Sequence, residues 1–460
     1  MGTEFSVEGQ RVTVGGAARS GIAAAELLAA KGALVTVNDA RSSVPERDRL
    51  ESLGIRVAAG GNDPALFRGA DLIVLSPGVP VEATFLDEAR RAGIPIIGEL
   101  ELASRWLRGR VIAITGTKGK STTTTLTGRM LDAAGFRTRV AGNIGTPLSA
   151  HVIDSTADTL HVVEASSFQL ETIERFHPWI AAVLNLSPDH LDRHPTEAAY
   201  AAAKARIFEN QDRADWAVVN ADDVGARRLA AGSVARRRWY GFDGVAEGVT
   251  VMGGTVVERG PDGDVPLLPT SSVRVSGRHI LSDVLAATAI SRLAGASPSA
   301  IADAVRGFTG LEHAMELAGD AGGVRFINDS KATNIASARR SIEAVDRGLV
   351  VILGGRFKGG DFRELRDPLR GRADGVVAIG EARPLIVDAL GDLLPVREAG
   401  SMADAVQTAW TMARPGGTVV LAPACSSFDM FVNYEERGKR FAELARGGAA
   451  AELATAGSAA

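Results

Sequence analysis

Cysteine is nearly absent from this chain of 460 residues, in which Cys425 is the only example. A single thiol excludes an intramolecular disulfide and a zinc site built from several cysteines. Because a lone cysteine in an ordinary globular chain usually packs as a small apolar side chain, we expect Cys425 to be buried rather than to act as a nucleophile.

Long apolar runs and an excess of one charge are absent too. No run approaches the roughly 18 apolar residues that a membrane-spanning helix needs. The opening MGTEFSVEGQ lacks the basic-then-apolar pattern of a signal peptide. The 51 basic residues nearly balance the 55 acidic ones, giving a formal charge of -4, so binding to nucleic acid or to a membrane is not expected. We predict a soluble, cytoplasmic monomer whose partners are small molecules. The densest basic cluster, Arg236-Arg237-Arg238, is expected to be a solvated surface.

Lysine is scarce, with seven examples among the 51 basic residues, so arginine fills most positive positions. Where arginine is the default, a retained lysine indicates chemistry that needs a compact ammonium or an amine able to lose its proton. Five of the seven lie in the motif segments described below: Lys118, Lys120, Lys204, Lys331 and Lys358.

The order of apolar runs, turns and helical stretches predicts an α/β protein of three domains. A strand at 12–16, a glycine-rich turn, a helix from Ser20 to Lys31 and a strand ending at Asp39 form the mononucleotide-binding unit of a doubly wound sheet. The stretch 245–275 predicts a small antiparallel insertion. The expected division is a Rossmann-like domain at 1–106, a central P-loop ATPase-type domain at 107–309, a second Rossmann-like domain at 310–446 and a disordered tail at 447–460.

The strongest motif is a glycine-rich loop between a strand at 111–115 and a helix: Gly116-Thr117-Lys118-Gly119-Lys120-Ser121-Thr122. Glycines let backbone N–H groups wrap phosphates, and the helix N-terminus adds a positive dipole. We expect Lys120 to reach the β- and γ-phosphates of ATP, and Ser121 or Thr122 to bind Mg²⁺. Two residues, not the usual four, separate the first glycine from the Gly-Lys pair, so the general phosphate-loop pattern is not matched. The alternative is a turn that only opens a helix.

This shortened loop resembles that of the Mur ligase and folylpolyglutamate synthetase superfamily, and other segments resemble the D-glutamate-adding Mur ligases. Those segments are Glu164-Ala165-Ser166-Ser167-Phe168-Gln169-Leu170, the run from Asn185 to His194, the helix of Tyr200 and Lys204, Asn328-Asp329-Ser330-Lys331-Ala332-Thr333-Asn334, and the stretch from Ala424 to Gly438. The resemblance covers most of the chain. It implies an ATP-dependent ligase that adds D-glutamate to UDP-N-acetylmuramoyl-L-alanine through an acyl phosphate, in peptidoglycan precursor synthesis.

The resemblance also implies two Mg²⁺ sites beside the phosphate loop. Glu164 and His190 each follow a strand and can supply oxygen and nitrogen ligands, with Ser121 as a further ligand. Lys204 is expected to be carbamylated by CO₂ and to help hold the second Mg²⁺, which requires an amine without its proton. Without the resemblance, His190 is equally well a loop hydrogen-bonding residue, and Lys204 a solvated helix lysine. The expected catalytic residues are Lys120, Glu164, His190 and Lys204.

The remaining site residues are those that the resemblance implies. In addition to the phosphate-loop residues, Asp329 and Lys331 are expected to contact ATP. The glutamate pocket is expected to contain Thr333, Lys358, Ser427, Phe428 and Tyr434. The UDP substrate is expected to contact Ser20, Asp39, Arg41, Ser76 and Gly78, with Asn143, Ser166 and Gln169 on its other parts.

Two departures from the family pattern affect ATP binding. The family usually has His-Asn-x-x-Asn where this chain has His279-Ile280-Leu281-Ser282-Asp283. It usually has His-Arg where this chain has His313-Ala314. The replaced side chains usually assist the binding of adenine and ribose.

Three alternative functions stay open from the sequence. The first is a related Mur or folylpolyglutamate-type ligase with another acceptor, such as L-glutamate. The second is a non-catalytic nucleotide-binding regulator on the same folds, although such a protein would not need Glu164, His190 and Lys204. The third is an NAD-dependent oxidoreductase, which rests only on the glycine-rich turn from Gly16 to Gly21.

Overall fold

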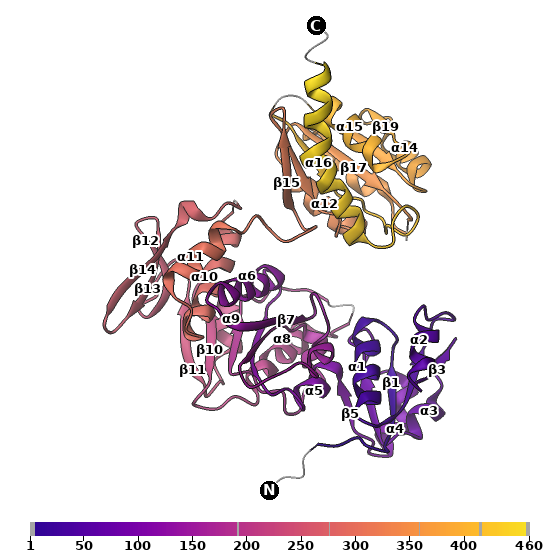
Figure 1. The fold of residues 1–460 in the computed structure, drawn as a ribbon, viewed down its shortest axis with the longest axis vertical. Helices are drawn as coiled ribbons and strands as arrows, with labels where there is room; N and C mark the ends of the chain where they lie inside the picture. The colour runs from indigo at the N-terminus through magenta and orange to yellow at the C-terminus, as the bar shows by residue number, and fades with distance from the viewer. Residues whose placement is uncertain (1–4, 191–192, 276, 358, 414–415, 457–460) are drawn as a thin grey trace. The chain divides into compact units, whose positions relative to one another are not determined.

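A computed structural model describes residues 5–190, 193–275, 277–357, 359–413 and 416–456. The chain forms two compact units, Met1–Phe308 and Thr309–Ala460. The first unit contains two sheets and the second contains one (Figure 1). In the described residues, no helix is long and apolar enough to cross a membrane.

The first sheet has the strand order β3-β2-β1-β4-β5, with every pair parallel. This is the order of a mononucleotide-binding half of a doubly wound fold, which confirms the Rossmann-like prediction. Its elements are β1 (Arg11–Gly15), α1 (Arg19–Ala30), β2 (Leu34–Asp39), α2 (Arg47–Ser52), β3 (Arg56–Ala59), α3 (Pro64–Arg68), β4 (Leu72–Leu75), η1 (Thr84–Leu86), α4 (Asp87–Arg91), β5 (Ile96–Gly98) and α5 (Glu99–Ser104).

The second sheet has nine strands in the order β14-β13-β12-β11-β10-β9-β6-β8-β7. Its elements are β6 (Arg110–Thr115), α6 (Lys120–Ala133), β7 (Arg137–Gly142), η2 (Leu148–His151), β8 (Thr159–Glu164), α7 (Ser167–Leu170), β9 (Ile180–Val183), α8 (Glu197–Ala205), η3 (Arg206–Phe208), β10 (Trp216–Asn220), α9 (Val224–Leu229), β11 (Arg236–Tyr240), β12 (Gly248–Met252), β13 (Thr255–Gly260), β14 (Gly263–Pro269), η4 (Thr270–Ser272), α10 (Arg278–Leu293) and α11 (Pro298–Arg306).

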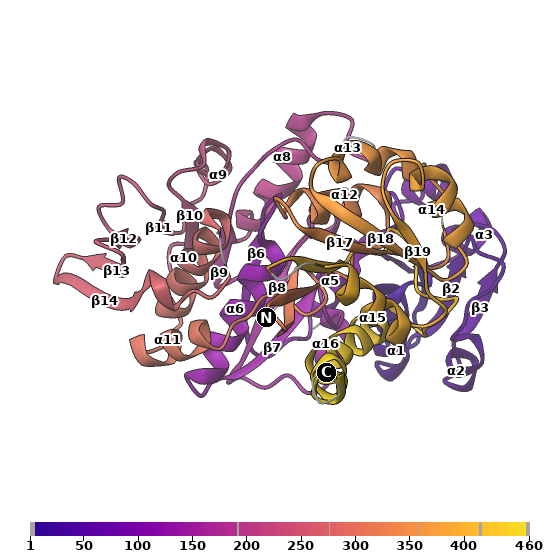
Figure 2. The same cartoon turned by 90° about the horizontal axis from the view of Figure 1, so that it is seen from above.

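Strands β12 to β14 form the antiparallel edge of this sheet, as predicted for 245–275. In Figure 2 they extend away from the parallel strands β6 to β9. The outermost strand, β14, carries Pro266 and Pro269 opposite Val257 and Thr255 of β13. Proline has no N–H to donate to a ladder and is therefore confined to sheet edges.

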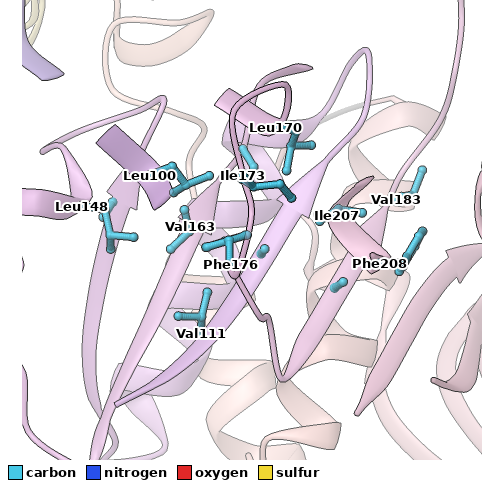
Figure 3. Close-up of a cluster of buried hydrophobic side chains, with 14 of the residues drawn as sticks. Leu100, Val111, Leu148, Val163, Leu170, Ile173, Phe176, Val183, Ile207 and Phe208 are labelled. Atoms are coloured by element: carbon cyan, nitrogen blue, oxygen red, sulfur yellow. The ribbon is translucent and has the colours of Figure 1, made fainter. Parts of the chain in front are cut away.

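The core beneath the parallel strands comes from alternate strand residues and from the segments that cross over them. Figure 3 shows Ile173 and Phe176 packed near Val163 of β8, and Ile207 and Phe208 beside Val183 of β9. These side chains are buried. Parallel strands that are covered in this way read as continuous apolar runs, as in VIAI of β6 and IAAV of β9. The packing fixes the strand ends that carry the site.

Glu101 of α5 joins the two sheets of the first unit. Its carboxylate is fully buried and accepts hydrogen bonds from the backbone N–H groups of Glu174, Arg175 and Phe176, at 2.8, 2.9 and 2.9 Å. Arg105 donates to the same carboxylate at 2.8 Å. A buried carboxylate with this many donors has its hydrogen-bonding capacity satisfied, and it fixes α5 against the segment 174–176.

The second unit is a six-stranded sheet in the order β15-β16-β20-β17-β18-β19, parallel except for β15. Its elements are β15 (Glu316–Ala321), β16 (Val324–Asn328), α12 (Ile335–Glu343), β17 (Leu349–Gly354), η5 (Phe362–Leu365), α13 (Arg366–Leu369), β18 (Ala373–Ile379), α14 (Arg383–Leu390), β19 (Val396–Glu398), α15 (Met402–Met412), β20 (Thr418–Leu421) and α16 (Tyr434–Ala456).

Helix α16 enters the stretch 447–460 that was predicted to be a disordered tail, and it continues to Ala456. Alanine, leucine and glutamate are strong helix formers, so the sequence AAAELATA extends the helix that precedes it. The exact domain boundaries near residues 106 and 309 stay predictions.

Candidate active site

The phosphate loop lies at the carboxyl edge of three neighbouring parallel strands, β8, β6 and β9. Asn185, just after β9, holds the loop from the side. Its Oδ1 accepts from the backbone N–H groups of Thr117 and Lys118 at 3.1 and 2.8 Å, and its Nδ2 donates to the Lys118 carbonyl at 3.0 Å. The loop is therefore shaped by the next strand's end as well as by its own glycines.

Gly119 is the residue that lets the loop turn into α6. It has a φ of 80°, in the left-handed region that favours glycine. A Cβ at this position would overlap Oδ1 of Asp283, on α10. Asp283 is buried, and burial raises the pKa of its carboxyl to about 8. A neutral carboxyl group therefore packs against the phosphate loop at pH 7.

Lys120 and Ser121 open helix α6. Lys120 Nζ donates to the carbonyl oxygens of Gly116 and Thr117, both at 2.9 Å, so its ammonium lies over the loop. Ser121 Oγ donates to Glu164 Oε2 at 2.7 Å, and Asn143 Nδ2 donates to Glu164 Oε1 at 2.6 Å. The structure thus brings two predicted metal ligands together, and it places Asn143 beside them.

Lys204 of α8 is almost completely buried behind the loop. Its Nζ donates to the Gly116 carbonyl at 2.8 Å and lies 4.6 Å from the ring centre of Tyr200. Burial, followed by the charge of Lys120, lowers the pKa of Lys204 to about 7. A substantial fraction of the Lys204 side chains is therefore the neutral amine at neutral pH. Tyr200 OH in turn lies 3.2 Å from Thr117 Oγ1.

His190 lies in the loop after β9, with a φ of 53° and a side chain that is 48% exposed. Its ring packs edge-on against Phe168 at 4.9 Å and lies 6.3 Å from the ring of Tyr200. Its Nε2 is 3.9 Å from Asp189 Oδ2. The ring is thus accessible while its backbone is fixed in a turn.

The donors near the phosphate loop are chemically suited to Mg²⁺, which prefers oxygen ligands and keeps several waters. Ser121 Oγ and the Glu164 carboxylate already point at each other across 2.7 Å. Among the described residues, three ligand atoms of His, Cys, Asp or Glu side chains lie within 4.8 Å of one another only at His177, Asp212 and Asp215. That group precedes β9 and β10 and is therefore at the opposite edge of the sheet.

In the first sheet, Asp39 ends β2 and its carboxylate closes the first glycine-rich turn. It accepts from Ala17 N at 2.6 Å, from Arg41 N at 2.8 Å and from Arg41 Nε at 2.8 Å. The hydrogen bond from Arg41 is the main reason why the pKa of Asp39 falls to about 2. Ser20 lies in the first turn of α1, and Ser76 and Gly78 follow β4, the strand next to β1.

Ser166 and Gln169 form the capping box of α7. Ser166 Oγ accepts from Gln169 N at 3.2 Å, and Gln169 Oε1 accepts from Ser166 N at 3.0 Å. The Nε2 of Gln169 is buried and has no hydrogen-bond partner among the described residues. A buried amide without a partner is costly, so this group is a candidate donor to a substrate.

In the second unit, Asp329 and Lys331 follow β16 and line a cavity of about 340 Å³ together with Met315, Ser337, Arg340 and Ser341. Asp329 accepts hydrogen bonds from Ser341 Oγ and from Met315 N. Burial raises the pKa of Asp329. Thr333 lies just after Lys331 and is half-buried.

Ser427 and Phe428 lie between β20 and α16, and Tyr434 is the first residue of α16. The Ser427 carbonyl accepts from Phe431 N at 2.8 Å, while the Phe428 side chain is 65% exposed. Tyr434 begins α16, and its carbonyl accepts from Ser330 Oγ at 2.8 Å. Lys358, the predicted partner of a glutamate carboxylate, lies outside the described residues.

Two residues that shape the loop, Asn185 and Asp283, have no role predicted from the sequence. Asn185 could have been found from its place at the end of β9, next to the loop-bearing β6. Asp283 was noted only as a departure from a family pattern, and no local signal places it against Gly119. The other departure is Ala314, and the histidine before it, His313, is buried with its Nδ1 2.9 Å from Asn328 Nδ2, as part of the packing of the second unit.

Comparisons with known proteins cover nearly the whole chain. Residues 10–98 match the profile described as Mur ligase MurD-like, N-terminal domain; residues 114–291 match Mur ligase middle domain; residues 313–425 match Mur ligase, glutamate ligase domain. The UDP-N-acetylmuramoylalanine--D-glutamate ligase of Acidobacterium capsulatum is 47% identical, over 98% of this chain and 100% of that protein. The protein of the same name from Koribacter versatilis is 44% identical, over 96% and 98%.

Among solved structures, the UDP-N-acetylmuramate-alanine ligase MurC of Thermotoga maritima has the same fold. It superposes with a TM-score of 0.56 at 18% identity, covering 94% of this chain and 98% of that one. The three profiles occur in the order of the predicted Rossmann-like, central and second Rossmann-like domains, which confirms the predicted three-domain α/β fold. On the strength of full-length identity and these profiles, the chain belongs to the Mur ligase family.

Proposed function

We propose that this chain is an ATP-dependent ligase that joins D-glutamate to the L-alanine carboxylate of UDP-N-acetylmuramoyl-L-alanine, with ADP and phosphate as the other products. One combined observation carries the proposal. The chain is 47% identical, over 98% of its length, to a ligase named for D-glutamate, and Ser121 Oγ at its phosphate loop lies 2.7 Å from Glu164 Oε2. ATP and Mg²⁺ suit the family and these donors.

The first step is phosphoryl transfer. A carboxylate oxygen of the alanine attacks the γ-phosphorus of ATP, the bond from phosphorus to the bridging oxygen breaks, and an acyl phosphate and ADP result. Because little covalent chemistry is needed from the protein, positioning and charge stabilisation dominate. The loop N–H groups from Gly116 to Thr122 would hold the phosphates, and Lys120 would move from the loop carbonyls onto the transferring group.

The second step is amide formation. The glutamate amine attacks the acyl carbon, the carbon–oxygen bond to phosphate breaks, and the amine loses a proton as the amide forms. We assign Thr333, Lys358, Ser427, Phe428 and Tyr434 to the glutamate. Asp329 and Lys331, which share one cavity, are assigned to ATP.

The UDP substrate is assigned to the first unit. Its contacts are proposed to be Ser20, Asp39, Arg41, Ser76, Gly78, Asn143, Ser166 and Gln169. Support comes from the buried, unpartnered Gln169 Nε2 and from the turn that Asp39 closes.

Two Mg²⁺ ions are proposed, held by Ser121, Glu164, His190 and a carbamylated Lys204. When bound, Mg²⁺ would offset negative charge on the phosphate oxygens. The support for carbamylation is the buried amine of Lys204, whose pKa of about 7 leaves a reactive neutral fraction. A carbamate would change this position from a cation to an anion, which is the charge that a cation site needs.

The test is phosphate release from ATP with UDP-N-acetylmuramoyl-L-alanine, comparing D-glutamate, L-glutamate and glycine. Release that requires both substrates and prefers D-glutamate supports the proposal. Release with L-glutamate alone would keep the ligase class and overturn the assignment of the acceptor. The absence of release with every amino acid would favour a nucleotide-binding regulator.

A further inference from the structure

His194 is a buried histidine that the proposed function leaves without a task. Its side chain is 2% exposed. Its Nε2 lies 2.9 Å from Ser167 Oγ, at the start of α7, and its Nδ1 lies 3.2 Å from Glu171 Oε1, at the end of α7. The tautomer with the proton on Nδ1 satisfies both contacts, because it donates to the carboxylate and accepts from the hydroxyl. We call these residues the Ser167–His194–Glu171 triplet.

The triplet has the residue types of a hydrolytic Ser-His-Glu triad, but its burial argues against that role. Ser167 is 2% exposed and is the first residue of helix α7, so a substrate carbonyl has no approach to its Oγ. A nucleophilic serine must be reachable by its substrate. The contacts therefore serve to hold the imidazole rather than to activate the serine.

The imidazole packs against two aromatic side chains behind the phosphate loop, Phe168 and Tyr200. It stacks on Phe168 with ring centres 5.5 Å apart, and it meets Tyr200 edge-on at 5.3 Å. Tyr200 in turn contacts the phosphate loop and the buried amine. Its hydroxyl lies 3.2 Å from Thr117 Oγ1, and the centre of its ring lies 4.6 Å from Lys204 Nζ. His194 thus fixes the ring that lines both the loop and the buried amine.

The backbone of His194 also shapes the turn that presents His190. The N–H groups of Arg193 and His194 both donate to the His190 carbonyl, at 3.0 and 2.9 Å. His190 has a positive φ of 53°, which is strained for a non-glycine residue and persists only where its surroundings hold it. On its other side, the His190 ring rests on Phe168, the residue that His194 stacks upon.

We propose that His194 is a positioning residue. Its contacts with Ser167 and Glu171 fix its ring, and the ring in turn holds His190, Tyr200 and Lys204 in place before nucleotide binds. This inference rests on the proposed function, because it assigns the roles of His190 and Lys204 as proposed there. It adds that the magnesium centre is pre-organised by a group that touches neither metal nor substrate.

The main variant is His194→Phe, which keeps an aromatic ring and removes both polar contacts. Ser167→Ala removes only one of the two partners of His194. The double variant His194→Phe/Ser167→Ala tests whether His194 and Ser167 act as a unit. The control is His177→Phe, which breaks a different histidine–carboxylate contact, from His177 Nε2 to Asp215 Oδ2 at 2.6 Å, at the opposite edge of the same sheet.

The first readout is hydrogen exchange in the metal-free, nucleotide-free protein. We expect amides in 193–200 to exchange about tenfold faster in His194→Phe, and to be unchanged in His177→Phe. The second readout is calorimetric binding of Mn²⁺ with ADP, which we expect to weaken about tenfold. The double variant should be no weaker than His194→Phe, because the contacts act together.

The outcomes separate this inference from the proposed function. Unchanged exchange and unchanged Mn²⁺–ADP binding in His194→Phe would overturn the inference while leaving the ligase intact. A wild-type protein that binds Mn²⁺–ADP but makes no amide product would overturn the proposed function, and the exchange result would still decide the positioning role. If His194→Phe does not fold, Ser167→Ala carries the same two readouts, with a smaller expected effect.

Discussion

The Nζ of Lys204 lies 2.8 Å from the carbonyl oxygen of Gly116, so the buried amine on α8 touches the first residue of the phosphate loop. Burial is the largest influence on this amine, and the nearby charge of Lys120 is the next. Both disfavour the ammonium. The contact therefore links the phosphate loop to a lysine whose charged form is disfavoured.

Replacing Lys204 with arginine is expected to lower kcat by at least about 100-fold. Arginine keeps the positive charge but cannot lose its proton or form a carbamate. In CO₂-depleted buffer, wild-type activity should rise when bicarbonate is added. It should also rise with pH through about 7, because the neutral amine is the form that reacts. Phosphate release measures both effects. A variant that keeps its activity, or a wild-type enzyme that is indifferent to bicarbonate, would contradict carbamylation.

Gly119→Ala is expected to abolish nucleotide binding and to lower the free energy of unfolding by about 2–4 kcal/mol. The new methyl group would overlap Asp283, and the alanine backbone would have to adopt a left-handed φ. The control is Gly135→Ala, after α6, where φ is 85° and nothing lies within 4 Å. That variant should lose only about 1 kcal/mol, which is the strain alone. Urea unfolding and ADP titration provide the comparison, and equal losses in both variants would rule out the overlap.

Glu101→Ala is expected to destabilise the first unit by about 3–5 kcal/mol, since three backbone N–H groups and the Arg105 guanidinium would lose their buried acceptor. Glu174→Ala removes an exposed carboxylate that also pairs with Arg105. It should cost at most about 1 kcal/mol. Denaturant midpoints test the difference; a Glu101 variant as stable as the Glu174 variant would refute the role of Glu101 as the joint.

Asp283→Asn is expected to stabilise the protein in a pH-dependent way. Burial raises the pKa of Asp283 from 3.8 to about 8, so the folded state binds more protons than the unfolded state between these pH values. Stability due to Asp283 is present below pH 4 and is lost as the pH rises to 8. The variant should therefore match the wild type near pH 4 and exceed it by at least about 2 kcal/mol at pH 9.

The control for this pH series is Asp262→Asn, which removes an exposed carboxylate in the turn between β13 and β14. Urea unfolding at pH 4, 7 and 9 gives the three comparisons. A constant difference between Asp283→Asn and the wild type at every pH would show that Asp283 titrates normally in the folded protein.

The sequence carried enough information for the strand-loop-helix units, because those depend on local patterns. The apolar run before Gly116, the glycines and the amphipathic helix after them are adjacent in the chain. The same holds for Asp39, which was expected at the end of a strand and ends β2. Such elements need no knowledge of distant partners.

Contacts between distant segments were not predictable in this way. Asp283 meets Gly119 across more than 160 residues, and only the packing of α10 on α6 brings them together. The run Arg236-Arg237-Arg238 was expected to be a solvated surface, and Arg236 and Arg237 are exposed while Arg238 is partly buried. The pairing of this run with β10, as most of β11, was not predicted. Arg236 and Arg238 lie over the Trp216 ring, and their aliphatic stems explain how charged residues fit this strand.

The prolines of β14 have a consequence for how the protein behaves in crowded solution. A nine-stranded sheet that ended in an open ladder would offer its edge to other copies of the chain, and such edges seed aggregation. Pro266 and Pro269 interrupt the donors of the outermost strand. The antiparallel insertion thus ends the sheet in a strand that is a poor template for further strands, and helps to keep neighbouring molecules apart.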